Sequence, residues 1–85
     1  MAHAVEFTPR ARRDLTALPQ RERRRVDRRI QALAENPRPR GVKKLHEGEG
    51  LYRVRAGDYR ILYRVESRAL VVLVVRIRHR REAYR

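Results

Sequence analysis

The sequence predicts an α+β fold: two N-terminal helices, forming a helical hairpin, pack on one face of a mainly antiparallel four-stranded sheet. Three observations predict it. Apolar residues recur at helical spacing before residue 36, alternate at strand spacing over 51–66, and fill nearly all of 69–77. The expected order is β-α-α-β-β-β, with a short C-terminal turn or helix. The 85 residues are expected to form one domain, 1–85.

The N-terminal half predicts one short strand and both helices. Residues 3–7 alternate in polarity, as a strand does. Thr8 and Pro9 predict a helix start, because a hydroxyl N-cap and a proline at the first helical position both favour one. The apolar stripe of this helix comprises Ala11, Leu15 and Leu18. Pro19 separates it from a second helix that ends near Asn36, whose arginine-rich run RERRRVDRR is interpreted as a solvated face.

The stretch LYRVRAGDYRILYRV, residues 51–65, predicts a hairpin of strands 51–56 and 59–66. Gly57 and Asp58 form its two-residue loop, with glycine where a type II′ turn needs a positive φ. This turn places Arg55 opposite Arg60, and opposed residues share a face of the sheet. The face predicted to pack on the helices comprises Tyr52, Val54, Ala56, Tyr59, Ile61 and Tyr63.

A third strand, at about 69–77, follows the hairpin and is apolar at every position except Arg76. Such a run suits a central strand that is covered on both faces. Residues 37–50 are rich in proline and glycine and predict a loop. The residues expected to be buried in the sheet are Val54, Ile61, Tyr63, Leu73 and Val75.

The other face of the hairpin collects Arg53, Arg55 and Arg60, with Arg64 beside them. Like charges directly opposite each other destabilise a sheet by roughly 0.2–1 kcal/mol. Their clustering therefore favours phosphate binding, because guanidinium forks match phosphate oxygens in two-point contacts. The remaining residues expected to bind RNA are Arg76, Arg78, His79 and Arg81 at the end of the sheet, and Lys43 and Lys44 in the loop. Tyr84 is expected to stack on a nucleobase.

Charge and composition narrow the class of partner. The net charge is +13, and the segment 37–85 carries +9 of it. Such an excess indicates a polyanion: nucleic acid, an acidic membrane or an acidic protein. The chain has no cysteine, which excludes disulfides and zinc–thiolate sites and fits the cytoplasm. The sequence predicts neither a secretory signal nor a membrane-spanning segment, and it shows no cluster of metal ligands.

Four stretches resemble the RelE/ParE toxin superfamily of bacterial type II toxin–antitoxin modules. They are FTPRAxRDL, NPRPxGVKKL, GLYRVRxGDYRILYRV and RHRRExYR. The resemblance implies a RelE-like, ribosome-dependent endoribonuclease that cuts mRNA in the ribosomal A site and inhibits translation. It implies no metal or small-molecule cofactor, contact with ribosomal RNA, no membrane, and neutralisation by a cognate acidic antitoxin. The resemblance assigns the family's catalytic roles to Arg53, Arg55, Arg60, Arg80 and Tyr84. The role given to Arg80 could instead belong to its neighbour Arg81.

One departure from the family affects the chemistry. Arg53 and Arg55 stand where the best-known pattern has lysines, one of them a proposed general base. Arginine does not deprotonate at working pH. Tyr84, His79, and a water or RNA group are therefore candidates for accepting the proton of the ribose 2′-hydroxyl. Two other functions stay open: a ParE-like inhibitor of DNA gyrase with the same fold, and a non-catalytic RNA-binding protein.

Overall fold

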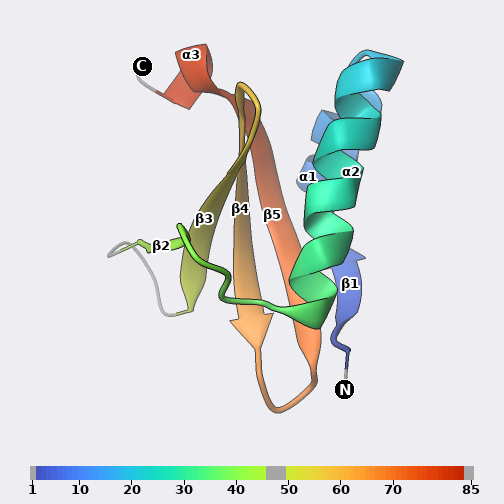
Figure 1. Ribbon diagram of the computed structural model, residues 1–85. Coiled ribbons are helices and arrows are strands. Elements are labelled where there is room, and N and C mark those ends of the chain that lie inside the picture. Colours follow the sequence, from blue (N-terminus) through green and yellow to red (C-terminus); the bar gives the residue numbers. More distant parts are fainter. Residues whose placement is uncertain (1, 46–49, 84–85) are drawn as a thin grey trace.

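The computed structural model describes residues 2–45 and 50–83. Its helices are α1 (Pro9–Thr16), α2 (Gln20–Glu35) and α3 (Arg80–Ala83). Its strands are β1 (Ala4–Phe7), β2 (Lys43–Lys44), β3 (Leu51–Ala56), β4 (Tyr59–Glu66) and β5 (Val71–His79). They form one sheet in the order β1-β5-β4-β3-β2, in which β1 is parallel to β5 and the other pairs are antiparallel. Both long helices lie on one side of this sheet (Figure 1).

The predicted α+β class is confirmed, whereas the predicted number of four strands is wrong. The fifth strand is β2, which lies in the segment 37–50 that was expected to be a loop. Two residues are too few to show any period, and the surrounding prolines and glycines conceal the strand. The last strand also begins and ends two residues later than expected, at Val71 and His79.

The first helix begins as the sequence predicts, and its cap also attaches it to the sheet. The Ala11 amide donates to Thr8 Oγ1 at 3.1 Å, which satisfies one amide of the first turn. The Thr8 hydroxyl in turn donates to the Val75 carbonyl at 3.0 Å, and the Thr8 amide donates to the Val74 carbonyl. The start of α1 is therefore fixed against the edge of β5, where β1 ends.

The hydrophobic core lies between the two long helices and the sheet. The helices contribute Ala11, Val26, Ile30, Leu33 and Ala34, and the sheet contributes Val54, Ala56, Ile61, Tyr63, Val65, Val72, Val74 and Ile77. Burying one large aliphatic side chain stabilises a fold by about 1.5–3 kcal/mol. Tyr63 is fully buried, and its hydroxyl donates to the Pro37 carbonyl at 2.7 Å. Burial raises the pKa of Tyr63 from 10.0 to about 12.

Leu73 and Val75 were expected in this core, and that prediction is wrong: both are only half-buried. The pairing of β4 with β5 explains the difference. Tyr63 lies opposite Val74 and Leu62 lies opposite Arg76, so that Val75 is the extra residue of a β-bulge. A bulge shifts the alternation of side chains by one residue. Val74 before the bulge and Ile77 after it therefore both face the helices.

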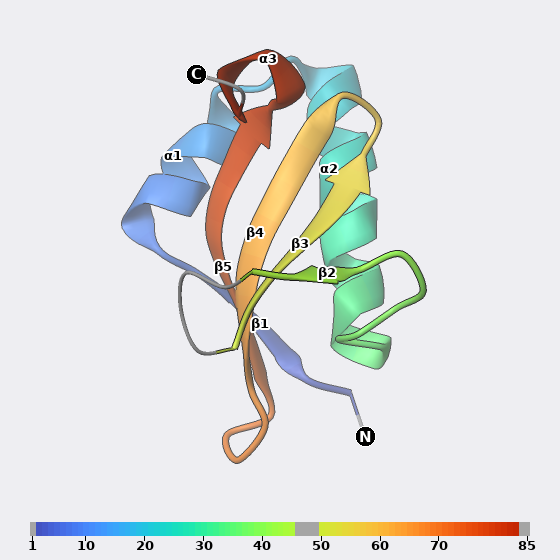
Figure 2. The same ribbon diagram turned by 90° about the vertical axis from the view of Figure 1, so that its left-hand side faces the viewer.

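The hairpin register is confirmed. Arg55 pairs with Arg60, and each of the other pairs from Leu51–Arg64 to Ala56–Tyr59 follows the same register. Gly57 has φ +61°, and Asp58 has no positive φ, as a type II′ turn requires. The fold therefore separates an apolar face of the hairpin from a charged one. Figure 2 looks onto the charged side, with α1 and α2 behind the sheet.

Candidate nucleic-acid interface

Cations from four strands meet on the side of the sheet away from α1 and α2. Arg55 of β3 lies opposite Arg60 of β4, which lies opposite Arg78 of β5. Lys43 of β2 lies opposite Arg53 of β3. Because directly paired residues share a face of a sheet, these five residues form one surface, here called the cationic face. It is wider than the two strands that the hairpin sequence predicts.

A groove of about 470 Å³ runs along this face and is lined by Gly41, Lys43, Arg53, Arg55 and Arg60. Three of the predicted catalytic residues therefore line one groove. Among the residues that the structure describes, the four side chains that line the groove are all cationic and none is a carboxylate. Such an arrangement concentrates positive potential where a phosphate group would sit.

The arginines of the groove differ in exposure. Arg55 is exposed, whereas Arg53 and Arg60 are half-buried. Partial burial restricts the rotamers of an arginine, and at Arg60 the burial reaches the Nε of the guanidinium. Arg53 and Arg60 are thus suited to bind a phosphate without a large further loss of side-chain entropy, and Arg55 is free to adjust to it.

Of the residues expected to bind RNA, Lys43 lines the groove, and Arg64 and Lys44 are among those that lie outside it. Arg64 is on the cationic side of the sheet but is paired with Leu51 and Leu73, beyond Leu62. Lys44 is paired with Tyr52 and therefore faces the helix side of the sheet. The alternation of the two-residue strand β2 thus brings Lys43 into the groove and turns Lys44 away from it.

Arg76 is bound within the protein. Its Nε lies 2.9 Å from Asp14 Oδ2, and the same oxygen accepts a hydrogen bond from the Ile77 amide at 3.0 Å. Asp14 belongs to α1, so this contact continues the attachment of α1 along the edge of β5. The sequence contains a signal for this contact. Asp14 lies in the apolar stripe of the first helix beside Ala11 and Leu18, where a carboxylate needs a partner.

The tail residues collect at the end of the sheet near the hairpin turn. The Arg80 amide donates to the Asp58 carbonyl at 2.7 Å, which joins α3 to that turn. Asp58, His79, Arg80 and Arg81 line a hollow of about 580 Å³. Tyr84, the predicted stacking residue, lies outside the described residues.

His79 does not share the cationic face. It pairs with Tyr59, whose other neighbour Ala56 is buried on the helix side. Its ring meets the Tyr59 ring edge-on with centroids 5.2 Å apart, and its Nδ1 accepts a hydrogen bond from the Arg81 amide at 3.1 Å. This position separates His79 from the groove and weakens its candidacy as the base there.

Arg38, which the sequence did not single out, holds Tyr52. Its Nε donates to Tyr52 Oη at 3.0 Å, and its guanidinium lies 5.4 Å from the centre of the Tyr52 ring. The hydrogen bond from Arg38 lowers the pKa of Tyr52 below its ordinary value of 10.0. Because Tyr52 faces the helix side, this pair stabilises the edge of the sheet and takes no part in the groove. No sequence pattern links residues so far apart in a loop and a strand.

Within residues 2–45 and 50–83, no group of three His, Asp or Glu side chains is placed to hold a metal ion. In the same part of the chain, no helix is long and apolar enough to cross a membrane.

Comparison with known proteins decides the family. The family described as ParE toxin of type II toxin–antitoxin system, parDE, matches residues 5–84. Toxin RelG of Mycobacterium tuberculosis is 36% identical over 86 residues, covering 100% of this chain and 99% of that protein. The chain belongs to the RelE/ParE superfamily of toxins. The resemblance noted in the sequence is thereby confirmed.

Solved structures of the superfamily share the fold. The toxin–antitoxin complex RelBE2 from M. tuberculosis contains a chain that matches with a TM-score of 0.80 and 35% identity, covering 93% of this chain and 99% of that one. The archaeal RelE–RelB complex from Pyrococcus horikoshii matches with a TM-score of 0.81 and 30% identity, covering 94% and 97% of the two chains. The toxin fold described above is therefore common to bacterial and archaeal relatives.

Proposed function

We propose that this toxin is a ribosome-dependent endoribonuclease that cleaves mRNA in the ribosomal A site and so inhibits translation. The observation that carries the proposal is the groove on the cationic face, where Lys43, Arg53, Arg55 and Arg60 converge. The names of the relatives, RelG and RelE, support the RelE branch of the superfamily.

The chemistry proposed is attack of a ribose 2′-hydroxyl on the adjacent phosphate. The bond from phosphorus to O2′ forms as the bond from phosphorus to the 5′-oxygen of the next nucleotide breaks, and that oxygen leaves with a proton as a 5′-hydroxyl. The phosphate gains negative charge as the new P–O bond forms. Arg53, Arg55 and Arg60 are assigned to hold the phosphate and to stabilise this charge, because preorganised cations act most strongly where charge develops. Holding the RNA in the attacking geometry supplies a further part of the acceleration. Arg80 and Tyr84 keep their proposed roles in phosphate stabilisation and base stacking.

The proton of the 2′-hydroxyl requires an acceptor, and the groove offers one new candidate. Of the described side chains that line it, Lys43 is the one amine, and the other three are guanidiniums that do not deprotonate. Lys43 is therefore proposed as the proton-transfer group. Tyr84 and a water or RNA group remain the alternatives.

A cognate antitoxin is the proposed partner that controls the activity. Solved relatives are toxin–antitoxin complexes. The net charge of +13 favours an acidic antitoxin that covers the cationic face. Such binding would also stabilise the small chain in proportion to its affinity.

Primer extension on ribosome-bound message tests the proposal. Wild-type toxin should cut the message, and Arg60→Ala should lower the cleavage rate by about 10²–10³, the usual cost of losing one transition-state donor. Arg64→Ala is the matched control, because Arg64 lies on the same side of the sheet outside the groove. Equal losses in the two variants would contradict the assignment of the groove.

The runner-up is inhibition of DNA gyrase, favoured by the match to the family described as ParE toxin. The same preparations should be assayed for gyrase supercoiling. Gyrase inhibition with intact message would replace the nuclease proposal with this one.

A further inference from the structure

The last part of β5 extends beyond the strand that borders it. β1 pairs with β5 only from Ala4–Val71 to Phe7–Val74, whereas β5 continues to His79. Among the residues that the structure describes, no strand pairs with this edge of β5 after Val74. The backbone amides and carbonyls of such an edge must find other partners. This end of β5 matters for function because it carries Arg78 of the cationic face.

Two side chains at α1 take the place of the missing strand, and they are here called the α1 clamp. The hydroxyl of Thr8, the N-cap of α1, donates to the Val75 carbonyl at 3.0 Å. Asp14, in the second turn of α1, accepts a hydrogen bond from the Ile77 amide at 3.0 Å through Oδ2. The same oxygen lies 2.9 Å from Arg76 Nε, and both side chains of this ion pair are mostly shielded from solvent. A charge-assisted hydrogen bond of this kind is stronger than a neutral one, so it fixes the carboxylate in place.

The clamp acts on the bulge, which decides the side of the sheet that Arg78 faces. Val74, before the bulge, is fully buried against the helices. In a regular strand Arg78 would face the same side as Val74, because side chains alternate with a period of two residues. The extra residue of the bulge shifts this alternation by one. Ile77 is therefore the buried residue, and Arg78 lies opposite Arg60 on the cationic face.

Both bonds of the α1 clamp are specific for the observed position of the bulge. Val75 is the extra residue itself, and Ile77 is the first core residue after it. Successive amides and carbonyls of a strand point to opposite edges. A bulge displaced by one residue would turn the bonded carbonyl and amide away from Thr8 and Asp14. The clamp thus stabilises the arrangement in which Arg78 reaches the cationic face.

We propose that Thr8 and Asp14 are positioning residues, which hold the bulge of β5 and thereby keep Arg78 beside Arg60 for contact with the RNA phosphate. The inference deepens the proposed function and rests on it for the reaction that is measured. Neither clamp residue lines the groove. Their effect on cleavage passes through Arg78, and displacing a group by about 1 Å costs on the order of 10² in rate.

Matched pairs of variants separate positioning from stability. Asp14→Ala removes the acceptor of the Ile77 amide. Asp14→Asn keeps an acceptor, because its two neighbours, the Ile77 amide and Arg76 Nε, are both donors and favour the side-chain oxygen. Thr8→Val removes the hydroxyl, and Thr8→Ser keeps it. Ile30→Val is the control for stability, since Ile30 is buried on α2 and the substitution leaves the clamp intact. Urea denaturation measures the stability of every variant.

Primer extension on ribosome-bound message measures the effect on cleavage. Asp14→Ala should lower the rate by about 10²-fold, and Thr8→Val should lower it in the same direction. Asp14→Asn, Thr8→Ser and Ile30→Val should stay near the wild-type rate. In the Arg78→Ala background, Asp14→Ala should cause no further loss, because two residues that act through one contact are not additive. A residue that served stability alone would lower the rate by the same factor in both backgrounds.

Three results would overturn the inference: a wild-type rate in Asp14→Ala, equal losses in Asp14→Ala and Asp14→Asn, or additive losses with Arg78→Ala. The same double-mutant cycle, measured as affinity for a 2′-O-methylated RNA strand by fluorescence anisotropy, does not require cleavage. Non-additive affinities with intact message would refute the nuclease proposal and support the inference. Additive affinities with cleaved message would support the nuclease proposal and refute the inference.

Discussion

Replacing Tyr63 by phenylalanine should produce a stability change that reverses sign with pH. Tyr63 is fully buried, and its hydroxyl donates to the Pro37 carbonyl at 2.7 Å. Tyr63→Phe removes this hydrogen bond and leaves the carbonyl without its donor. At pH 8 the loss should be about 1–2 kcal/mol in the free energy of unfolding.

The raised pKa of Tyr63 makes the wild-type protein lose stability at high pH. Burial raises that pKa from 10.0 to about 12, so the folded state holds the phenolic proton more tightly than the unfolded state. The resulting stability is fully present below pH 10 and is lost as the pH rises from 10 to 12. The loss is about 1.4 kcal/mol at pH 11 and approaches about 2.7 kcal/mol above pH 12. Because phenylalanine does not titrate, the wild-type and variant stabilities should cross near pH 11.

Urea denaturation followed by circular dichroism, at pH 8 and at intervals up to pH 11.5, measures this difference. Tyr52→Phe is the control with the opposite sign. The hydrogen bond from Arg38 lowers the pKa of Tyr52, so its contribution grows as the pH rises through that pKa. A difference between wild type and Tyr63→Phe that stays constant from pH 8 to pH 11.5 would refute the reasoning.

Three further predictions concern the groove and its support. Lys43→Arg keeps the cation but removes the proposed proton-transfer group. The rate of message cleavage in primer extension should fall by about 10²–10⁴, while the affinity for RNA measured by anisotropy is retained. An unchanged cleavage rate would show that Lys43 does not transfer the proton. Arg55→Lys adds a second amine to the groove, and the pH–rate profile for message cleavage should gain a limb that wild type lacks; an unaltered profile would mean that this position holds the phosphate only. Asp14→Asn removes the charge that pairs with Arg76 but keeps an oxygen that can accept from the Ile77 amide. Urea denaturation should show a loss of about 1–2 kcal/mol in the free energy of unfolding. No loss would show that the Arg76 contact adds nothing to stability.

The sequence predicted the elements whose local pattern is strong. The hairpin register followed from Gly57 and the alternation on both sides of it, and the cap at Thr8 followed from the hydroxyl before Pro9. Both features depend on neighbouring residues alone. The convergence of Arg53, Arg55 and Arg60 on one face then required only the period of a strand.

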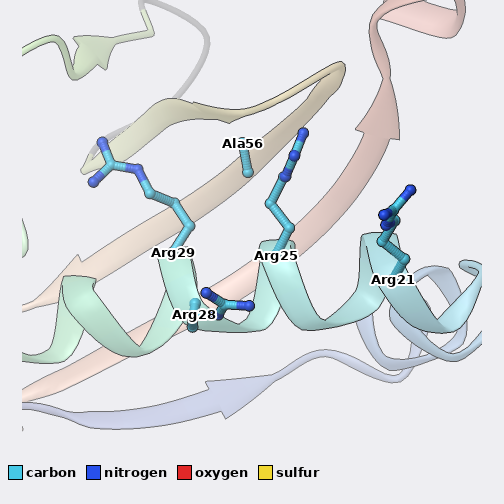
Figure 3. Close-up of a pocket in the computed structure, with 5 residues that line it drawn as sticks. All are labelled: Arg21, Arg25, Arg28, Arg29 and Ala56. Atoms are coloured by element: carbon cyan, nitrogen blue, oxygen red, sulfur yellow. The ribbon is translucent and has the colours of Figure 1, made fainter.

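What the sequence did not predict depends on contacts between distant segments. The bulge at Val75 arises from the pairing of β4 with β5, and it reverses the burial expected for Leu73 and Val75. Lys43 enters the groove only because β2 pairs with Arg53. The arginine-rich run of α2 was interpreted as a solvated face, because nothing in its spacing shows that Ala56 of β3 lies beside these arginines (Figure 3).

Folding and the proposed binding are assigned to opposite faces of the same strands, and this makes them separable by mutation. Among the residues that the structure describes, no charged residue is buried. On β4, Arg60 faces the groove while its neighbour Ile61 is fully buried, and Ile61 lies opposite the buried Val54. Substitution of Arg60 therefore removes a phosphate ligand at a half-buried position, whereas truncation of the fully buried Ile61 to alanine would cost about 2–5 kcal/mol. If a groove variant loses cleavage activity while its free energy of unfolding is unchanged, the loss is one of catalysis and not of folding. The two can be separated because groove residues and core residues alternate along the strand.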